Sequence, residues 1–294
     1  PYCISFSVGL QVLFLPILGA IADYSHLRKR MMQLFATIGA IATIGMFFIT
    51  GDLWWLGGVL FIIANLTFGA AIVFYNAYLP DIASEEERDR VSSYGWAMGY
   101  LGGGILLALN LAFFTFSDAL GVPGGLAVRI NLASAGIWWL AFSFITWSRL
   151  RPRHAARSLP GGETYLSIGF KQLGRTFREI KHFPETLRYL FAYFLYNDGI
   201  QTVIAVASTF AAAPLLRGGL ELPQDTLIAV ILMIQFVAFF GALFWGKLAK
   251  WIGAKQSVVV SLVIWAGVVI YAYGGLYGES RIAQFFILGI FIAI

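Results

Sequence analysis

Long apolar segments separated by polar loops constrain this chain more than any other feature of its sequence. An α-helix rises about 1.5 Å per residue, so about 20 apolar residues cross the roughly 30 Å hydrocarbon core of a bilayer. With 59% hydrophobic and 12% charged residues, the 294-residue chain has too little polar surface for a soluble domain. The sequence therefore predicts an all-α, polytopic membrane protein. The expected spans are 5–22, 31–50, 54–79, 92–116, 128–148, 189–213, 226–246, 257–276 and 282–294.

Lysine and arginine are concentrated in every second loop between these spans. All but three of the 20 basic residues lie in the first, third, fifth and seventh loops. The exceptions are Arg217 and Arg281 in even-numbered loops and Arg129, which stands at the edge of the span 128–148 and is counted with the fourth loop. Cytoplasmic loops of membrane proteins carry an excess of Lys and Arg, so we expect the odd-numbered loops to face the cytoplasm. A nucleic-acid-binding protein would gather its basic residues on one surface, so the net charge of +5 does not indicate nucleic acid.

Cysteine and histidine offer no site for a metal or for catalysis. Cys3 is the single cysteine, and His26, His154 and His182 lie far apart in polar segments. This spacing is unlike that of metal ligands, so we expect no metal, no cofactor and no catalytic residue.

The longest polar stretch, 149–188, divides the chain into an N-terminal helical bundle, 1–148, and a C-terminal helical bundle, 189–294. Within this cytoplasmic linker, apolar residues recur at helical spacing between basic residues, at Phe170, Leu173, Phe177 and Ile180. The pattern predicts a basic amphipathic helix. Such a helix would lie on the inner membrane surface or act as a solvated connector, and the sequence leaves both open.

A weak internal repeat relates the two parts. Residues 19–28 align with residues 246–255 at an offset of 227, and each segment directly follows an apolar span. The two copies are six spans apart, an even number, so both halves keep the same orientation, as in a parallel repeat. The repeat predicts twelve spans in the whole protein, with the first span and the last spans absent from this chain. Chance similarity of two short loops is the alternative.

The first copy of this repeat resembles the signature loop of the major facilitator superfamily. Gly19-x-x-Ala22-Asp23 is followed by the basic residues 28–30, although Tyr24 and His26 stand where that family has a basic residue and a glycine. The second copy resembles the family's degenerate repeat, with Lys250 in place of the acid. The resemblance implies a two-bundle fold of which about nine of twelve spans are present.

Four further segments, 73–83, 87–92, 99–104 and 193–202, are similar to the vacuolar-effluxer-like branch of the superfamily. That branch includes the autophagy-related vacuolar amino-acid effluxers and their bacterial relatives. The resemblance implies efflux or exchange of amino acids or other small solutes.

In the superfamily, the acid of the signature loop and the basic residues after it latch the two halves together on the cytoplasmic side. The resemblance therefore implies such a latch here, and a glycine at position 19 would let two helices approach closely. The alternative is that the basic residues 28–30 only set the topology. The mixed charge run 85–90 adds two gate candidates, although such a run usually forms a solvated face. The candidate gate residues are Gly19, Asp23, Arg28, Lys29, Arg88 and Arg90.

Asp198 lies ten residues past Arg188, roughly 15 Å along its helix and near the expected membrane midplane. An ionised Asp there costs about 2.5–3.5 kcal/mol on insertion scales, so it must be protonated, face water, bind a cation or substrate amine, or pair with another span. A buried hydrogen bond between helices is the alternative. Polar residues at i, i+4 and i+8 form a stripe beside it. The candidate substrate- or proton-binding residues are Asp198, Asn197, Gln201, Tyr193, Asn76, Tyr75 and Gln235.

These features together predict a secondary active transporter that moves a small solute by alternating access. Amino acids are the candidate solutes, and proton coupling is the candidate energy source. A membrane-embedded enzyme would need more than one intramembrane acid, so the alternative is a non-transporting multispan scaffold or a channel. The expected partners are the lipid bilayer, a small-molecule solute and protons, with no nucleic acid. We expect a monomer in a bacterial inner membrane.

Overall fold

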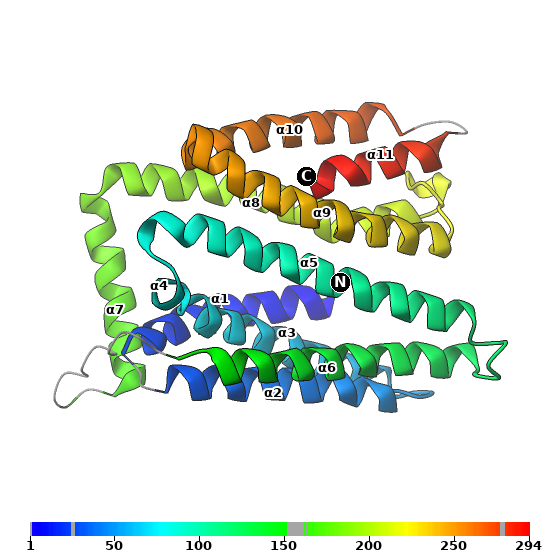
Figure 1. Ribbon diagram of the computed structural model, residues 1–294, viewed down its shortest axis with the longest axis horizontal. Helices are drawn as coiled ribbons and strands as arrows, with labels where there is room; N and C mark the ends of the chain where they lie inside the picture. Colours follow the sequence, from blue (N-terminus) through cyan, green and yellow to red (C-terminus); the bar gives the residue numbers. More distant parts are fainter. Residues whose placement is uncertain (1, 25–26, 152–161, 163, 277–279) are drawn as a thin grey trace. The chain divides into compact units, whose positions relative to one another are not determined.

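The structure is a computed structural model that describes all residues except 1, 25–26, 152–161, 163 and 277–279 (Figure 1). Within the described residues it contains helices and turns but no strand. Eight helices in the described part of the chain are long and apolar enough to cross a membrane, which confirms the all-α, multispan expectation. They are α1 (Tyr2–Tyr24), α2 (Arg28–Gly45), α3 (Trp54–Asn76), α5 (Arg88–Thr115), α6 (Gly124–Arg149), α8 (Pro184–Ala212), α9 (Gln224–Ile252) and α10 (Ala254–Gly274).

Shorter helices complete the chain. The ninth expected span corresponds to α11 (Arg281–Ala293), which has 13 residues, and the expected amphipathic helix is α7 (Tyr165–Glu179). A four-residue helix, α4 (Leu79–Ile82), follows α3. The remaining elements are 3-10 turns: η1 (Met46–Phe48), η2 (Glu85–Glu87), η3 (Ile180–His182) and η4 (Leu215–Arg217).

Several helices extend beyond the expected spans, so basic residues lie near their ends. Arg129 is the sixth residue of α6, and its guanidinium donates to the carbonyl of Phe47 over 3.4 Å. The guanidinium carbon also lies 5.6 Å from the centre of the Phe47 ring. A long basic side chain near a helix end can reach toward the interface, so this position is compatible with a membrane span.

Backbone contacts divide the chain into two units, which we describe separately. Unit 1 comprises Pro1–Glu85 and Ala112–His182, and unit 2 comprises Glu86–Leu111 and Phe183–Ile294. This grouping differs from the sequence-based division in two elements. Most of α5 belongs to unit 2, although the sequence assigned it to the bundle 1–148, and α7 belongs to unit 1. The division into two bundles joined by a linker stays a prediction.

In unit 1, α2 packs against α3 and α6, and α1 packs against α3 and α7. The core at one end of this unit contains Ile21, Ala22, Met32, Phe74 and Tyr78. Phe74 is fully buried, and its ring stacks on that of Phe35 with centroids 5.9 Å apart.

In unit 2, α9 packs against α10 and α11, and it makes fewer contacts with α8. The core of these helices includes Val230, Val268, Phe285 and Leu288. The part of α5 in this unit meets α9 at a pair of glycines. A Cβ atom on Gly103 would lie 2.8 Å from the side-chain nitrogen of Gln235.

The glycines of α5 differ in what surrounds them. The spacing of Gly95, Gly99 and Gly103 at every fourth residue predicts close helix packing along this face. The structure confirms this for Gly103, but a Cβ on Gly99 would have no described heavy atom within 4 Å.

A close helix contact in unit 1 joins α2 and α6. A Cβ on Gly136 would lie 2.7 Å from the carbonyl oxygen of Ala40 and 2.8 Å from the backbone nitrogen of Ile44. On the facing helix, a Cβ on Gly39 would overlap the ring of Trp139. Small residues let helix backbones approach closely in membranes, and this pair of glycines sets the separation of α2 and α6.

Replacing Gly136 by Ala should destabilise the protein by about 1–3 kcal/mol, the range for overpacking a filled core. Two of the three clashing atoms, the oxygen of Ala40 and the nitrogen of Ile44, belong to the backbone of α2, so side-chain rotation cannot relieve the overlap. The measurement is thermal unfolding of the full-length protein in detergent. Gly99→Ala is the matched control, because it makes the same change inside a helix at an open position. Equal melting temperatures for the two variants would contradict the prediction.

Candidate functional site

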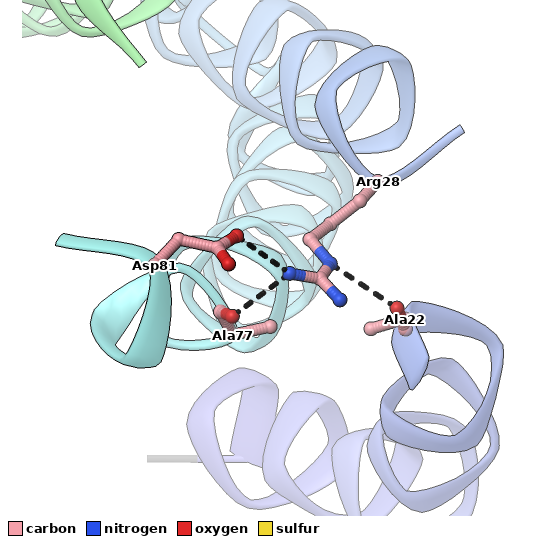
Figure 2. A network of polar contacts seen from close by, with 4 residues as sticks. All are labelled: Ala22, Arg28, Ala77 and Asp81. Atoms are coloured by element: carbon pink, nitrogen blue, oxygen red, sulfur yellow. Dashed lines mark hydrogen bonds and ion pairs between the residues drawn. The ribbon is translucent and has the colours of Figure 1, made fainter. Parts of the chain in front are cut away.

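A network of polar contacts surrounds Arg28, the first residue of α2. Its Nε donates to the carbonyl of Ala22 over 3.2 Å. Its Nη1 donates to the carbonyl of Ala77 over 3.0 Å and to Oδ2 of Asp81 over 3.2 Å. Figure 2 shows the guanidinium between these three acceptors, which come from three different helix ends. We call Arg28, Asp81, Ala22 and Ala77 the arginine node.

The acceptors of the arginine node are groups that need an external donor. Ala22 lies in the last turn of α1, and Ala77 directly follows α3. Carbonyls at the C-terminal end of a helix lack partners within the helix and carry partial negative charge. A guanidinium has five N–H donors in a rigid plane, so one arginine can satisfy both helix ends and a carboxylate.

The local sequence brings Asp81 to this position. Pro80 lies in the first turn of α4, where its missing N–H costs no hydrogen bond, and it starts the short helix that carries Asp81. The amide of Asp81 donates to the carbonyl of Tyr78 over 2.9 Å. The sequence therefore turns the chain sharply after α3 and points the acid back toward α2.

The arginine node is nearly closed to solvent. The side chain of Arg28 is 15% exposed and that of Asp81 is 2% exposed. The buried ring of Tyr78 lies beside the guanidinium, with its centroid 5.5 Å from the guanidinium carbon. A buried ion pair depends on both partners, because removal of either leaves a charge with a large desolvation cost.

Lys29, the next residue of α2, binds a further helix end. Its Nζ donates over 3.1 Å to the carbonyl of Leu150, which directly follows α6. The first, third and fifth loops of the predicted topology therefore meet at one end of unit 1. This is the arrangement that the alternation of basic loops predicts for loops on one side of the membrane.

In unit 2, the third and seventh loops of the predicted topology likewise lie close together. A hollow of about 410 Å³ is lined by the start of α5, the end of α9 and the start of α10. Its lining residues include Asp89, Ser93, Ala249 and Ala254. The close approach of α5 and α9 here depends on Gly246, because a Cβ on this residue would lie 2.8 Å from the side chain of Ser93.

The other predicted gate residues have varied surroundings. A Cβ on Gly19 would meet Val73 at 3.9 Å, an ordinary contact, so this position does not require glycine within unit 1. The side chain of Asp23 lies outside the described part of the structure, and its latch with Arg28 and Lys29 stays a prediction. Arg90 forms an exposed ion pair of 2.5 Å with Glu87, as expected for a solvated face. Arg88 is half-buried.

Asp81 is the site residue that sequence reasoning missed. It lies within the segment 73–83 that carries the family resemblance, but it looked like one acid among several in the third loop. A usable signal was present, because Asp81 immediately follows a span on the side where the basic residues of the first loop gather. Acids in such positions are candidates for pairing between loops.

The polar stripe that includes Asp198 lies in the middle part of α8. Asp198 is the fifteenth of the 29 residues of α8, and its side chain is exposed among the described residues. Gln201 and Tyr193 are also exposed, and Asn197 is half-buried. The ring of Tyr193 packs against those of Tyr189 and Tyr196, with centroids 6.4 Å and 5.3 Å away.

The remaining candidate binding residues lie on other helices. Tyr75 and Asn76 are exposed at the C-terminal end of α3 in unit 1. Gln235 is the twelfth residue of α9 in unit 2 and is half-buried against Gly103 and Gly104. For Gln235, a role in helix packing is therefore observed, and a role in solute binding stays a prediction.

Comparison with known families adds the decisive observation. The family model described as vacuole effluxer Atg22 like matches residues 1–294, the full length of this chain. The chain belongs to this family. The match confirms the resemblance to the vacuolar-effluxer-like branch. The family is one of effluxers, which are membrane transporters and not enzymes.

Curated relatives of this Atg22-like chain come from bacteria and fungi. The Bacillus subtilis protein named uncharacterized MFS-type transporter YxiO is 28% identical over 295 residues, which cover 99% of this chain and 66% of the relative. Autophagy-related protein 22-1 of Penicillium rubens is 26% identical, covering 93% of this chain and 57% of the relative. Autophagy-related protein 22 of Yarrowia lipolytica is 27% identical, covering 90% and 55%.

The Atg22-like chain thus spans between 55% and 66% of the length of these relatives. No solved structure matches it. Within the described residues, no group of His, Cys, Asp and Glu side chains is placed to hold a metal ion.

Proposed function

We propose that this Atg22-like protein is a secondary active transporter that moves a small solute across a membrane by alternating access. Amino acids are the proposed solute class, and protons are the proposed coupling ion. Membership of an effluxer family and eight membrane-length helices support the proposal. The observation that carries it is Asp198, an exposed acid in the middle of α8.

An acid at this depth is costly unless water, a cation or a proton stabilises it. No described residue forms a hydrogen bond or an ion pair with Asp198. A carboxylate in a hydrated cavity could bind the ammonium group of an amino acid or carry a proton. Asn197 and Gln201 beside it offer amide donors and acceptors for the rest of a solute.

The arginine node supports the conformational part of the proposal. Alternating access in parallel-repeat transporters is largely a rigid-body rocking of one bundle against the other. Such motion requires the helices within each bundle to stay packed in the same way while the opening between the two bundles changes. In unit 1, Arg28 and Lys29 together hold the ends of α1, α3 and α6 to the start of α2.

The proposed setting is a bacterial inner membrane, with the odd-numbered loops in the cytoplasm and the protein acting as a monomer. The excess of basic residues in these loops supports the orientation. The match to the Bacillus subtilis relative supports a bacterial setting.

The direct test is counterflow with the full-length protein in proteoliposomes. Vesicles loaded with one unlabelled amino acid at a time should take up the same amino acid in labelled form faster than protein-free vesicles. If the folded protein exchanged none of the amino acids, amino acids would be excluded as the solute class. A steady ion current without exchange would favour a channel, and neither activity for any class of small solute would favour a scaffold.

A further inference from the structure

Helix α7 is a defined helix in a segment that is otherwise polar. Thr164 and Ser167 form a reciprocal capping box at its start. The Thr164 hydroxyl accepts from the amide of Ser167 over 3.2 Å, and the Ser167 hydroxyl accepts from the amide of Thr164 over 2.9 Å. This arrangement satisfies two amides that the first turn of a helix leaves free. The sequence therefore specifies a helix here, not an extended connector.

One face of α7 is already occupied. The helix packs against α1, and Ile168 and Gly169 are buried in unit 1 while Leu173 is half-buried. The part of the amphipathic pattern that includes Ile168 and Leu173 is thus explained by packing within the protein.

A second face of α7 is aromatic and exposed. Phe170 is 59% exposed and Phe177 is 72% exposed. The two residues are seven positions apart, which is about two helical turns, so they lie on the same side of the helix. Within unit 1, most of the surface of these two phenyl rings, which lie outside the membrane-length helices, therefore remains uncovered.

A strip of positive charge runs beside the aromatic face. Lys171 and Arg178 each follow one of the two phenylalanines, are also seven residues apart and are exposed. Arg175 is exposed as well and forms an ion pair of 2.7 Å with Glu179. Helices that lie in the interface of an anionic membrane typically combine aromatic residues with lysine and arginine.

The orientation of α7 suits such an interface. Figure 1 shows α7 running transverse to the long helices of unit 1. The chain enters the linker leading to α7 at Leu150, whose carbonyl binds Lys29 at the end where the odd-numbered loops meet. A helix transverse to the spans at this end would lie parallel to the membrane surface.

We propose that α7 is a binding surface for anionic lipids of the leaflet it faces. Phe170 and Phe177 insert among the acyl chains, and Lys171 and Arg178 contact the lipid phosphates. Charge complementarity favours anionic lipids as the ligand, since each basic residue near an anionic bilayer adds to the attraction between the helix and the bilayer. The proposal rests on the membrane-spanning fold and holds whether or not amino acids are the solute.

The first test locates the side chain at position 177. A nitroxide attached to Phe177→Cys, in full-length protein whose other cysteines are replaced, is reconstituted in vesicles that contain phosphatidylglycerol. We expect high accessibility to oxygen and low accessibility to a water-soluble nickel complex. High accessibility to nickel would place the residue in water, and low accessibility to both would mean that another part of the protein covers it; either result overturns the proposal. The same label at Arg175→Cys is the control and should be accessible to nickel.

The second test asks whether the lipid charge matters. The immersion of the label at position 177 should increase with the fraction of phosphatidylglycerol in phosphatidylcholine vesicles. The double variant Lys171→Gln/Arg178→Gln should need a higher fraction for the same immersion, because each lost charge weakens the attraction about fivefold. Lys247→Gln/Lys250→Gln, which removes two charges from α9, is the matched control and should leave the curve unchanged. An immersion that does not depend on phosphatidylglycerol, or a double variant that behaves as the wild type, would overturn the assignment of anionic lipid.

Discussion

Asp198→Asn should reduce solute uptake driven by a pH gradient to the level of protein-free vesicles. Asparagine keeps the size of the side chain and its hydrogen-bonding capacity, but it cannot bind or release a proton. Counterflow, which needs no net proton movement, should persist if the residue carries only the proton. The measurement compares both activities of the full-length protein in the same proteoliposomes, with a solute that the counterflow test has identified.

The matched control is Asp118→Asn, which makes the same change at an exposed acid in the loop after α5. It should leave both activities unchanged. Uptake by Asp198→Asn that keeps its dependence on the pH gradient would refute the proposed coupling. Loss of counterflow as well as coupled uptake would instead assign Asp198 to solute binding, for example to an ammonium group.

Arg28→Ala should destabilise the protein by about 3–5 kcal/mol, the range for breaking a buried ion pair. The substitution removes the guanidinium from a carboxylate that is 2% exposed and from two carbonyls at helix ends. Arg28→Lys should recover only part of this loss, because an ammonium cannot span three acceptors that a planar guanidinium reaches. The measurement is thermal and denaturant unfolding of the full-length protein in detergent.

Arg30→Ala is the control, since it removes the same charge from an exposed position two residues along α2. The double variant Arg28→Ala/Asp81→Ala should be more stable than Arg28→Ala alone, because it also removes the buried carboxylate. Equal stability of Arg28→Ala and Arg30→Ala would show that the arginine node contributes no more than a surface charge.

The two sites differ in how much the sequence revealed about them. Asp198 could be placed at mid-span because an acid stands out in an apolar helix, and its depth follows from counting residues. Arg28 was found through the family resemblance, but the partner that the structure shows is Asp81, 53 residues away. That partner depends on the turn after α3 and on the approach of α3 to α2, which no local pattern encodes.

The sequence by itself determined the membrane-length helices, the sidedness pattern of the basic loops and the amphipathic character of α7. These features are local, because a segment in lipid must satisfy its backbone hydrogen bonds internally and therefore becomes a helix wherever it is long and apolar enough. Only the tertiary structure decided which helix faces meet. In that structure Gly136 lies in close contact with α2, whereas Gly99 has no described neighbour within 4 Å of its Cβ position. Most of α5 groups with α9, and Asp81 forms an ion pair with Arg28. Those outcomes depend on residues distant in sequence approaching within a few ångströms, and the spacing of residues along one helix does not specify its partner.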